Sequence, residues 1–239
     1  MESLAFSPDG KLLASGSADG RLTLWDLENN QKLGTLQERG DFIYSVIFNP
    51  AGTKLAAGSG NATVTLWDLK KNGIISTYSE HGGRVTSIAF NPDGSLLAAG
   101  SCAKKETSGL CSLGEIALWN LEKNEKQELT AHSDTVNTVT FSPDGKWFAS
   151  GGEDGKIILW NTNNWQPVGG PLTGHESSVL NLAFSHNSKY LASASQDKSI
   201  ILWDIPTREI AGQPLRGHTR AVFGLSFSPD DRMLASGSW

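Results

Sequence analysis

Short runs of alternating apolar and polar residues recur along the whole chain, each closed by a turn signal. In residues 178–216 the runs SVLNLAF, YLASAS and SIILWDI are separated by the polar stretches SHNSK and QDK, and a weaker run, IAGQPL, follows. Alternation with a period of two and many β-branched residues favour strands. Because no stretch has helical spacing of apolar residues over two turns, the pattern predicts four strands per unit and no helix.

Two sequence markers repeat with the same period. A Phe before the SPDG-like turn recurs at intervals of 42, 42, 51, 43 and 43 residues, and a Trp followed by Asp or Asn recurs at intervals of 42, 52, 41 and 43. Both intervals lengthen by about ten residues in the third unit, so both markers report one internal repeat. The Trp residues are Trp25, Trp67, Trp119, Trp160 and Trp203.

Four-stranded units of this length with Gly-His and Trp-Asp markers resemble the WD-repeat (WD40) β-propellers. The Gly-His element is present as Gly174-His175 and Gly217-His218, and in weaker form as Glu80-His81 and Ala131-His132. The resemblance covers essentially the whole chain and implies an all-β fold in one propeller domain, residues 1–239. The blades expected from it are residues 1–37, 41–79, 84–130, 135–173 and 178–216, with a partial blade at 221–239.

The sixth unit stops after two strands, so the pattern predicts about five and a half blades in an open or incomplete ring. Such a ring leaves an unpaired strand edge and two apolar blade faces in water, which proteins generally avoid. We therefore expect the chain to be a fragment of a longer protein, or to be capped by a second chain. In isolation it is expected to self-associate through its open blade edges.

The resemblance also implies a buried hydrogen-bond chain of Trp, Ser, His and Asp in each blade. A carboxylate is costly to bury unless donors satisfy it, and these side chains are suitable donors. A hydrolase triad is the alternative interpretation, but the same group occurs in two units, which is unusual for an active site. The expected sets are Trp160, Ser150, His132 and Asp154 in unit four and Trp203, Ser193, His175 and Asp197 in unit five.

The set is incomplete in the other units. Unit one keeps Ser15, Asp19 and Trp25 but has no His. Unit three keeps His81, with Ala99 at the Ser position and the Asp position lost in an insertion.

In the family, the loops before each first strand and the turns between the second and third strands form one face, here called the top face, which often binds peptides. Exposed aromatic side chains are enriched at interfaces, so Phe42, Tyr44, Phe223 and Trp239 are the first candidates. The alternative is that they pack between blades. The positions carried over by spacing also include Gly60, Thr135, Ser178 and Ala221, with Glu2 and Ala18 in unit one, and the residues predicted to bind a partner are Phe42, Tyr44, Arg84, Thr86, Asn137, Glu153, Leu180, Gln196, Phe223 and Trp239.

The insertion in unit three, residues 102–115, is expected to be a loop that projects from the top face. Cys102 and Cys111 within it either close a small disulfide loop or remain as two reduced thiols. Two Cys residues without a nearby His do not favour a zinc site.

Composition narrows the classes of function. The chain has 239 residues, 38% of them hydrophobic, which is enough apolar material for a core. A formal net charge of −5 gives no indication of nucleic-acid binding. No apolar run approaches the ~18 residues of a membrane span, and the N-terminus does not resemble a secretory signal. These features predict a cytoplasmic protein.

The sequence therefore predicts a non-catalytic scaffold that presents loop residues to a protein or peptide, with no cofactor, metal, nucleic acid or membrane as partner. The linkers PVGGPLTGH and IAGQPLRGH look like those of bacterial WD arrays, which suggests the sensor or assembly region of a larger signalling protein. The alternative is an enzyme or small-molecule binder that uses the central channel. The innermost strands offer small, hydroxylic or apolar residues and no paired acids, which disfavours that alternative.

Overall fold

The computed structural model describes residues 3–37, 40–79, 81–106, 109 and 111–239. The regular secondary structure of these described residues consists of β-strands alone. No helix among the described residues is long and apolar enough to cross a membrane. The strands form five antiparallel sheets of one design, which we call blades one to five, and a final two-stranded sheet, which we call the half-blade. The predicted all-β architecture of propeller blades is confirmed.

Each blade pairs its first four strands in chain order, as expected for strands joined by short turns. Blades one to three contain β1 (Ser3–Phe6), β2 (Leu12–Gly16), β3 (Leu22–Asp26), β4 (Gln31–Gln37), β5 (Ile43–Phe48), β6 (Lys54–Ser59), β7 (Val64–Asp68), β8 (Gly73–Tyr78), β9 (Ser87–Phe90), β10 (Leu96–Lys105), β11 (Cys111–Asn120) and β12 (Glu125–Leu129). The rest contain β13 (Val136–Phe141), β14 (Trp147–Gly152), β15 (Ile157–Asn161), β16 (Gln166–Pro167), β17 (Val179–Phe184), β18 (Tyr190–Ser195), β19 (Ser199–Asp204), β20 (Glu209–Ile210), β21 (Leu215–Arg216), β22 (Val222–Phe227) and β23 (Leu234–Ser238).

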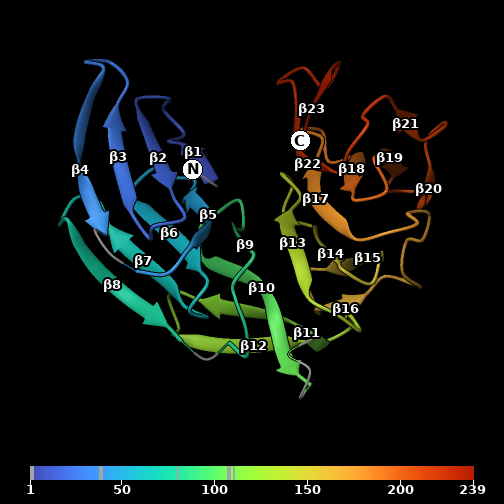
Figure 1. Ribbon diagram of the computed structural model, residues 1–239, viewed down its shortest axis with the longest axis horizontal. Coiled ribbons are helices and arrows are strands. Elements are labelled where there is room, and N and C mark those ends of the chain that lie inside the picture. Colours follow the sequence, from blue (N-terminus) through green and yellow to red (C-terminus); the bar gives the residue numbers. More distant parts are fainter. Residues whose placement is uncertain (1–2, 38–39, 80, 107–108, 110) are drawn as a thin grey trace.

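The blades follow one another along an arc that does not close. The first strands of successive blades, β1, β5, β9, β13, β17 and β22, contact one another and line the inside of the arc. Blade one, in blue, and the half-blade, in red, face each other across its open end (Figure 1). The predicted open ring of five complete blades and one partial blade is therefore present in the structure.

Buried apolar side chains fill the space between neighbouring blades. Between blades one and two, Leu22 packs with Ile43, Val46 and Phe48, and the same arrangement recurs between the later blades. A Gly in the second strand lets the blades approach closely. At Gly151, for example, an added Cβ would lie 2.6 Å from Cγ1 of Val179 in the next blade. Burial of this kind is the main source of blade-to-blade cohesion.

The SPDG-like turns join the first two strands of each blade. Gly52, Gly94 and Gly145 have φ between 67° and 74°, the left-handed conformation that the turn requires. Ser188 and Asp231 take the same place in the last two units, with φ of 59° and 58°. Asp231 also accepts hydrogen bonds from two main-chain N–H groups of blade five, so this turn ties the half-blade to its neighbour.

The outer strands of blades four and five are shorter than predicted. Blade four has only the two-residue β16, and the expected fourth strand of blade five is split into β20 and β21, both of which pair with β19. The segments PVGGPL and IAGQPL contain Pro and Gly, which weaken or interrupt a strand ladder.

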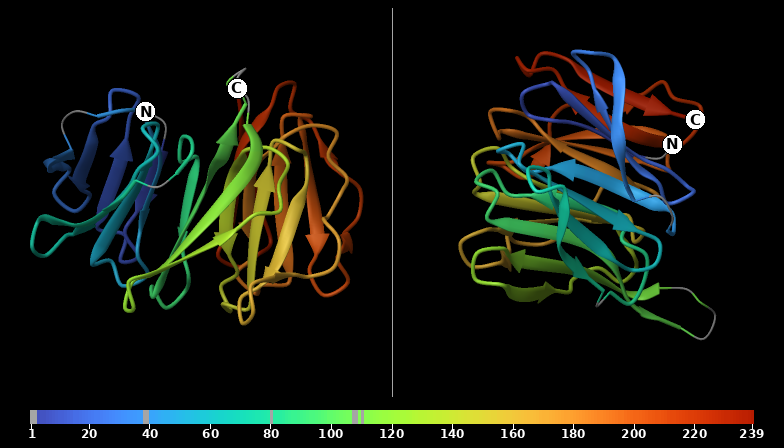
Figure 2. Two further views of the ribbon diagram at one scale, coloured as in Figure 1. Left: turned by 90° about the horizontal axis from the view of Figure 1, so that it is seen from below. Right: turned by 90° about the vertical axis from the view of Figure 1, so that its left-hand side faces the viewer.

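The insertion in blade three is a strand extension rather than the predicted loop. β10 and β11 each have ten residues and pair as far as Lys105 opposite Cys111, with irregular register near Lys104. A disulfide joins Cys102 to Cys111, so of the two alternatives for these thiols the structure has the bonded one. The hairpin extends beyond the ends of the neighbouring blades (Figure 2).

Candidate functional site

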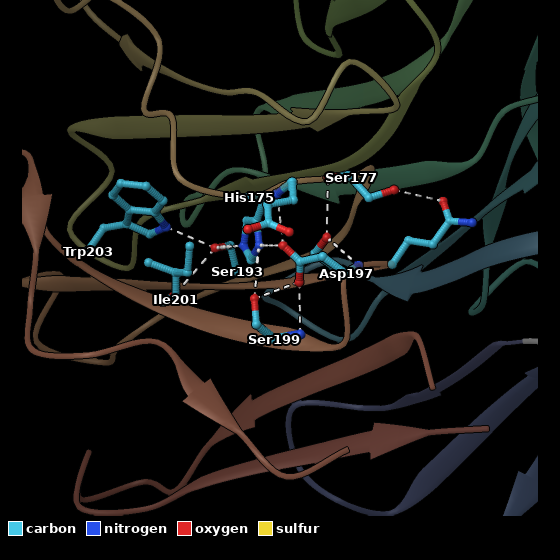
Figure 3. A network of polar contacts seen from close by, with 10 residues as sticks. His175, Ser177, Ser193, Asp197, Ser199, Ile201 and Trp203 are labelled. Carbon is cyan, nitrogen blue, oxygen red and sulfur yellow. Dashed lines mark hydrogen bonds and ion pairs between the residues drawn. The ribbon is translucent and has the colours of Figure 1, made fainter. Parts of the chain in front are cut away.

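The four residues predicted for blade five are joined in one hydrogen-bond chain (Figure 3). The Trp203 indole N–H donates to Ser193 Oγ at 2.8 Å, and Ser193 Oγ lies 2.7 Å from His175 Nε2. His175 Nδ1 lies 2.8 Å from Asp197 Oδ2. The His175 tautomer with its proton on Nδ1 satisfies both contacts. Its Nε2 then accepts a hydrogen bond from the Ser193 hydroxyl, and its Nδ1 donates one to the Asp197 carboxylate.

Blade four repeats the same chain. The Trp160 indole donates to Ser150 Oγ at 3.0 Å, Ser150 lies 2.9 Å from His132 Nε2, and His132 Nδ1 lies 3.0 Å from Asp154 Oδ1. Ser150 has no exposed surface, and neither does Ser193 in blade five. A hydroxyl that is enclosed in this way cannot reach a substrate in solution. The arrangement therefore braces the interior of the blade.

The Asp carboxylates in these chains are held in their ionised form. Burial raises the pKa of Asp197, but hydrogen bonds from Ser199, from the Glu176 N–H and from His175 outweigh it and lower the pKa to about 2. Burial also opposes ionisation at Asp154, where hydrogen bonding and charge interaction with His132 lower the pKa. Each carboxylate thus anchors the loop that brings its His to the blade.

Blade three uses different residues for the same purpose, which corrects the prediction for this unit. His81 Nδ1 lies 3.0 Å from Ser101 Oγ and 3.5 Å from Glu115 Oε1, and Ser101 donates to Glu115 Oε2 at 3.3 Å. Glu115 is buried on β11, and Lys126 Nζ lies 3.9 Å from Oε1. The polar partner is Ser101 rather than the residue at Ala99, and a strand Glu replaces the missing turn Asp. A Glu inside the apolar run EIALW was the available sequence signal.

The ends of the arc keep parts of the chain. In blade one the Trp25 indole donates to Ser15 Oγ at 2.9 Å, and Asp19 accepts hydrogen bonds from Ser17 Oγ and the Arg21 N–H. In the half-blade, His218 Nε2 lies 2.7 Å from Ser236 Oγ.

Four of the predicted partner-binding residues meet on the top face. The rings of Phe42 and Tyr44 stack with centroids 4.6 Å apart. The Arg84 guanidinium carbon lies 5.7 Å from the Tyr44 ring centroid, and Arg84 Nη2 lies 3.5 Å from Glu153 Oε1. These side chains come from blades two, three and four, so three blades converge on one point.

A pocket of about 400 Å³ opens at this point. It is lined by the blade-two turn, by the disulfide hairpin of blade three and by the loops of blade four. Burial and the charge of Asp134 raise the pKa of Glu153, against the opposing effect of Arg84. The lining residues are Asp41, Tyr44, Gly60, Arg84, Cys102, Gly109, Cys111, Thr135 and Glu153.

Thr86 and Asn137 are half-buried and bond to main-chain carbonyls. Thr86 Oγ1 donates to the main-chain carbonyls of Gly100 and Val136, and Asn137 Nδ2 donates to the carbonyl of Val179. Both side chains therefore bond across or within the blades, and their contact with a partner stays a prediction. The spacing of residues along the chain predicts where Thr86 and Asn137 lie in their blades, but it does not predict which main-chain carbonyls lie beside their side chains.

The remaining predicted residues lie away from the pocket. Leu180 is half-buried on β17, and Gln196 is exposed in a turn, where its Oε1 accepts a hydrogen bond from Ser177. Phe223 and Trp239 stack with centroids 5.1 Å apart at the end of the arc. Ala18 is exposed in blade one, and Glu2 lies outside the described residues.

The inner side of the arc offers little for catalysis. A pocket of about 280 Å³ lies between the ends of the inner strands of blades four, five and the half-blade, lined mainly by apolar residues with Phe141, Phe184 and Phe227 among them. His186 reaches it, and its Nδ1 lies 3.0 Å from Asp231 Oδ1. Among the described residues, no group of three or more His, Cys, Asp or Glu side chains could hold a metal ion.

Comparison with known families matches most of the chain to one repeat. The WD40 family, described as "WD domain, G-beta repeat", matches residues 2–26, 30–68, 72–105, 123–161, 165–204 and 211–239. Segments 30–68, 123–161 and 165–204 each begin with the outer strand of one blade and end with the third strand of the next, because the family repeat starts at the outer strand.

Relatives from three organisms match shorter segments. "Periodic tryptophan protein 2 homolog" of Dictyostelium discoideum is 42% identical over 59 residues, which is 23% of this chain and 6% of the relative. "Notchless protein homolog" of Arabidopsis thaliana is 50% identical over 46 residues, or 18% of this chain and 10% of the relative. "Small ribosomal subunit protein RACK1" of Caenorhabditis elegans is 47% identical over 49 residues, or 20% of this chain and 15% of the relative. All three organisms are eukaryotes, so these matches do not support the predicted likeness to bacterial arrays.

Proposed function

Because the chain belongs to the WD40 repeat family, we propose that it is a non-catalytic interaction scaffold whose top face binds a protein or peptide. The observation that carries this proposal is the convergence of Tyr44, Arg84 and Glu153 from three blades on one pocket, with the ring of Phe42 stacked on that of Tyr44. Aromatic side chains around a central depression are typical of the energetic centre of an interface.

The distribution of polar groups supports binding over catalysis. The His, Ser and Asp side chains that resemble a triad are enclosed inside blades four and five and already satisfy one another. Tyr44, Arg84 and Glu153 at the top-face pocket are instead partly exposed. A rigid array of strands holds them at fixed positions, which lowers the entropy lost on binding.

Two finer parts of the proposal concern context. The segments shared with the three relatives are 46–59 residues long, about the length of one repeat, and make up 6–15% of those proteins. We propose an assembly or sensing role in signalling for this repeat array. The cytoplasmic location stays a prediction, as does the absence of nucleic-acid and membrane partners.

The proposal is tested by comparing captured proteins. The immobilised wild-type chain and a Phe42→Ala/Tyr44→Ala variant are incubated with the same lysate of the source organism, crosslinked and quantified by mass spectrometry. A Leu33→Ala/Ile74→Ala variant, altered at exposed apolar residues of outer strands, is the matched control. We expect a set of proteins that the wild type and the control retain and the top-face variant loses. Equal capture by all three chains would refute the proposal.

A further inference from the structure

The top-face pocket carries more negative than positive charge. Asp41 and Glu153 line it, and Asp134 lies close enough to Glu153 to raise the pKa of that carboxyl. Arg84 is the cationic residue that lines it among the described residues. Two carboxylates and one guanidinium therefore line the pocket, with a third carboxylate near Glu153, and the field inside the pocket favours an additional cation.

Arg84 is held loosely where it lies. Its contact with Glu153 is a single approach of 3.5 Å, and its side chain remains half-exposed. Exposed ion pairs of this kind contribute ~0–1 kcal/mol, so the guanidinium can leave at little cost. The guanidinium of Arg84 also lies over the ring of Tyr44, with its carbon 5.7 Å from the ring centroid. The place that Arg84 occupies therefore offers a planar cation both a carboxylate and an aromatic face.

We propose that the pocket receives an arginine side chain of the partner, and that Arg84 occupies this place in the free protein. The incoming guanidinium would pair with Glu153 and lie over Tyr44, and Arg84 would swing toward solvent. This inference rests on the proposed function, because it names the chemistry that the same face recognises.

An acidic ligand fits the pocket less well. To bind a carboxylate or phosphate, Arg84 would have to give up Glu153 while the ligand approached Asp41, Asp134 and Glu153. Like charges so placed oppose binding. A lysine would gain the attraction of the carboxylates but would lack the planar stacking that Tyr44 provides.

The test uses selection from a displayed library of random dodecapeptides on the wild-type chain. We expect enriched peptides to share an arginine. By fluorescence anisotropy, Glu153→Gln should then weaken binding of a selected peptide about tenfold, the scale of one charged hydrogen bond. Arg84→Ala should tighten binding, because it removes the competing guanidinium. Replacing the arginine of the peptide by citrulline, which changes the ligand and leaves the protein intact, should weaken binding as Glu153→Gln does.

The outcomes separate this inference from the proposed function. Enriched peptides that are acidic, that tolerate citrulline, or that bind Arg84→Ala more weakly would overturn the arginine inference while leaving a peptide-binding face in place. Failure to enrich any peptide that distinguishes the wild type from the Phe42→Ala/Tyr44→Ala variant would overturn both. Glu122→Gln, on an exposed turn away from the pocket, is the control and should bind as the wild type does.

Discussion

Ser193 shows how one hydroxyl connects two parts of a blade. Its oxygen receives the Trp203 indole N–H from the third strand, and it lies against His175 from the loop before the first strand. Asp197 then holds His175 from the turn between the second and third strands. Three segments of one blade are thus fixed to one another by side-chain hydrogen bonds, and removing one side chain leaves others unsatisfied.

The first prediction concerns this carboxylate. Asp197→Ala should lower the free energy of unfolding by about 1–3 kcal/mol, because His175 and the Glu176 N–H lose their acceptor. Asp19→Ala is the matched control in blade one, where no His is available and the effect should be smaller. Urea denaturation followed by tryptophan fluorescence measures both. Equal effects at the two sites would contradict the role assigned to the chain.

A second prediction follows from the ionisation of Asp197. Its pKa is about 2 in the folded protein and 3.8 ordinarily. A group whose pKa is lowered by folding stabilises the protein above its ordinary pKa, and this contribution is lost as the pH falls toward the folded value. The stability difference between the wild type and Asp197→Asn should therefore shrink between pH 3.8 and about 2. Urea denaturation across this range measures it, and a constant difference would argue against the assignment.

At the scale of the strand, closeness between blades depends on small residues at fixed positions. Gly151 on β14 leaves no room for a methyl group beside Val179. Gly237 has the corresponding place on β23, where an added Cβ would meet no atom within 4 Å because no blade follows. The same residue type therefore has different packing at the two sites.

Our third prediction uses this pair. Gly151→Ala should cost about 1–3 kcal/mol of stability through overpacking. Gly237→Ala should change it by no more than ~0.5 kcal/mol, as at an ordinary surface site. Thermal denaturation of the two variants gives the comparison. A large loss at Gly237 would mean that the outer face of the half-blade is covered in solution.

Strands and turns follow from local sequence, which explains why the fold could be predicted. Period-two runs and SPDG-like turns recur in each unit, and they need no information about distant residues. The extension of hairpin β10–β11 was missed because the inserted residues lack the alternation that predicts a strand. In the structure, main-chain pairing continues along β10 and β11, and the disulfide between Cys102 and Cys111 joins the two strands. Ser101 was missed because it lies two residues after the position that Ser150 and Ser193 occupy in their blades, and Glu115 was missed because it lies on β11 and not in the turn where the Asp was expected.

The candidate site was predictable in position but not in geometry. Spacing placed Phe42, Tyr44, Arg84 and Glu153 on one face. The ion pair between Arg84 and Glu153 joins different blades, and which side chains meet across blades depends on how the blades turn relative to one another. Thr86 and Asn137 show the same limit, since the carbonyls that they bind belong to other strands.

At the scale of the molecule, the open arc exposes residues that are buried elsewhere. Leu4 and Phe6 on β1 are 48% and 65% exposed, whereas Val46 and Phe48, at the same places on β5, are 5% exposed. Blade one covers Val46 and Phe48, whereas Leu4 and Phe6 lie on the open side of blade one. Trp239 at the other end is 82% exposed. Apolar groups that remain in water at both ends favour association.

The fourth prediction is that the isolated chain associates through these ends. Light scattering should give a mass that rises above that of the monomer as concentration increases. Leu4→Lys/Phe6→Lys should reduce this rise, whereas Leu33→Lys/Ile74→Lys, on outer strands, should not. A mass that stays monomeric at all concentrations would contradict the prediction.

Hydrogen–deuterium exchange of the intact chain with a selected peptide tests most directly whether the top face is the binding surface. The account predicts slower exchange around residues 41–44, 82–86, 133–135 and 153–155, with unchanged exchange in the outer strands. Slower exchange centred on the outer strands, or on the inner-strand ends at Phe141, Phe184 and Phe227, would contradict it.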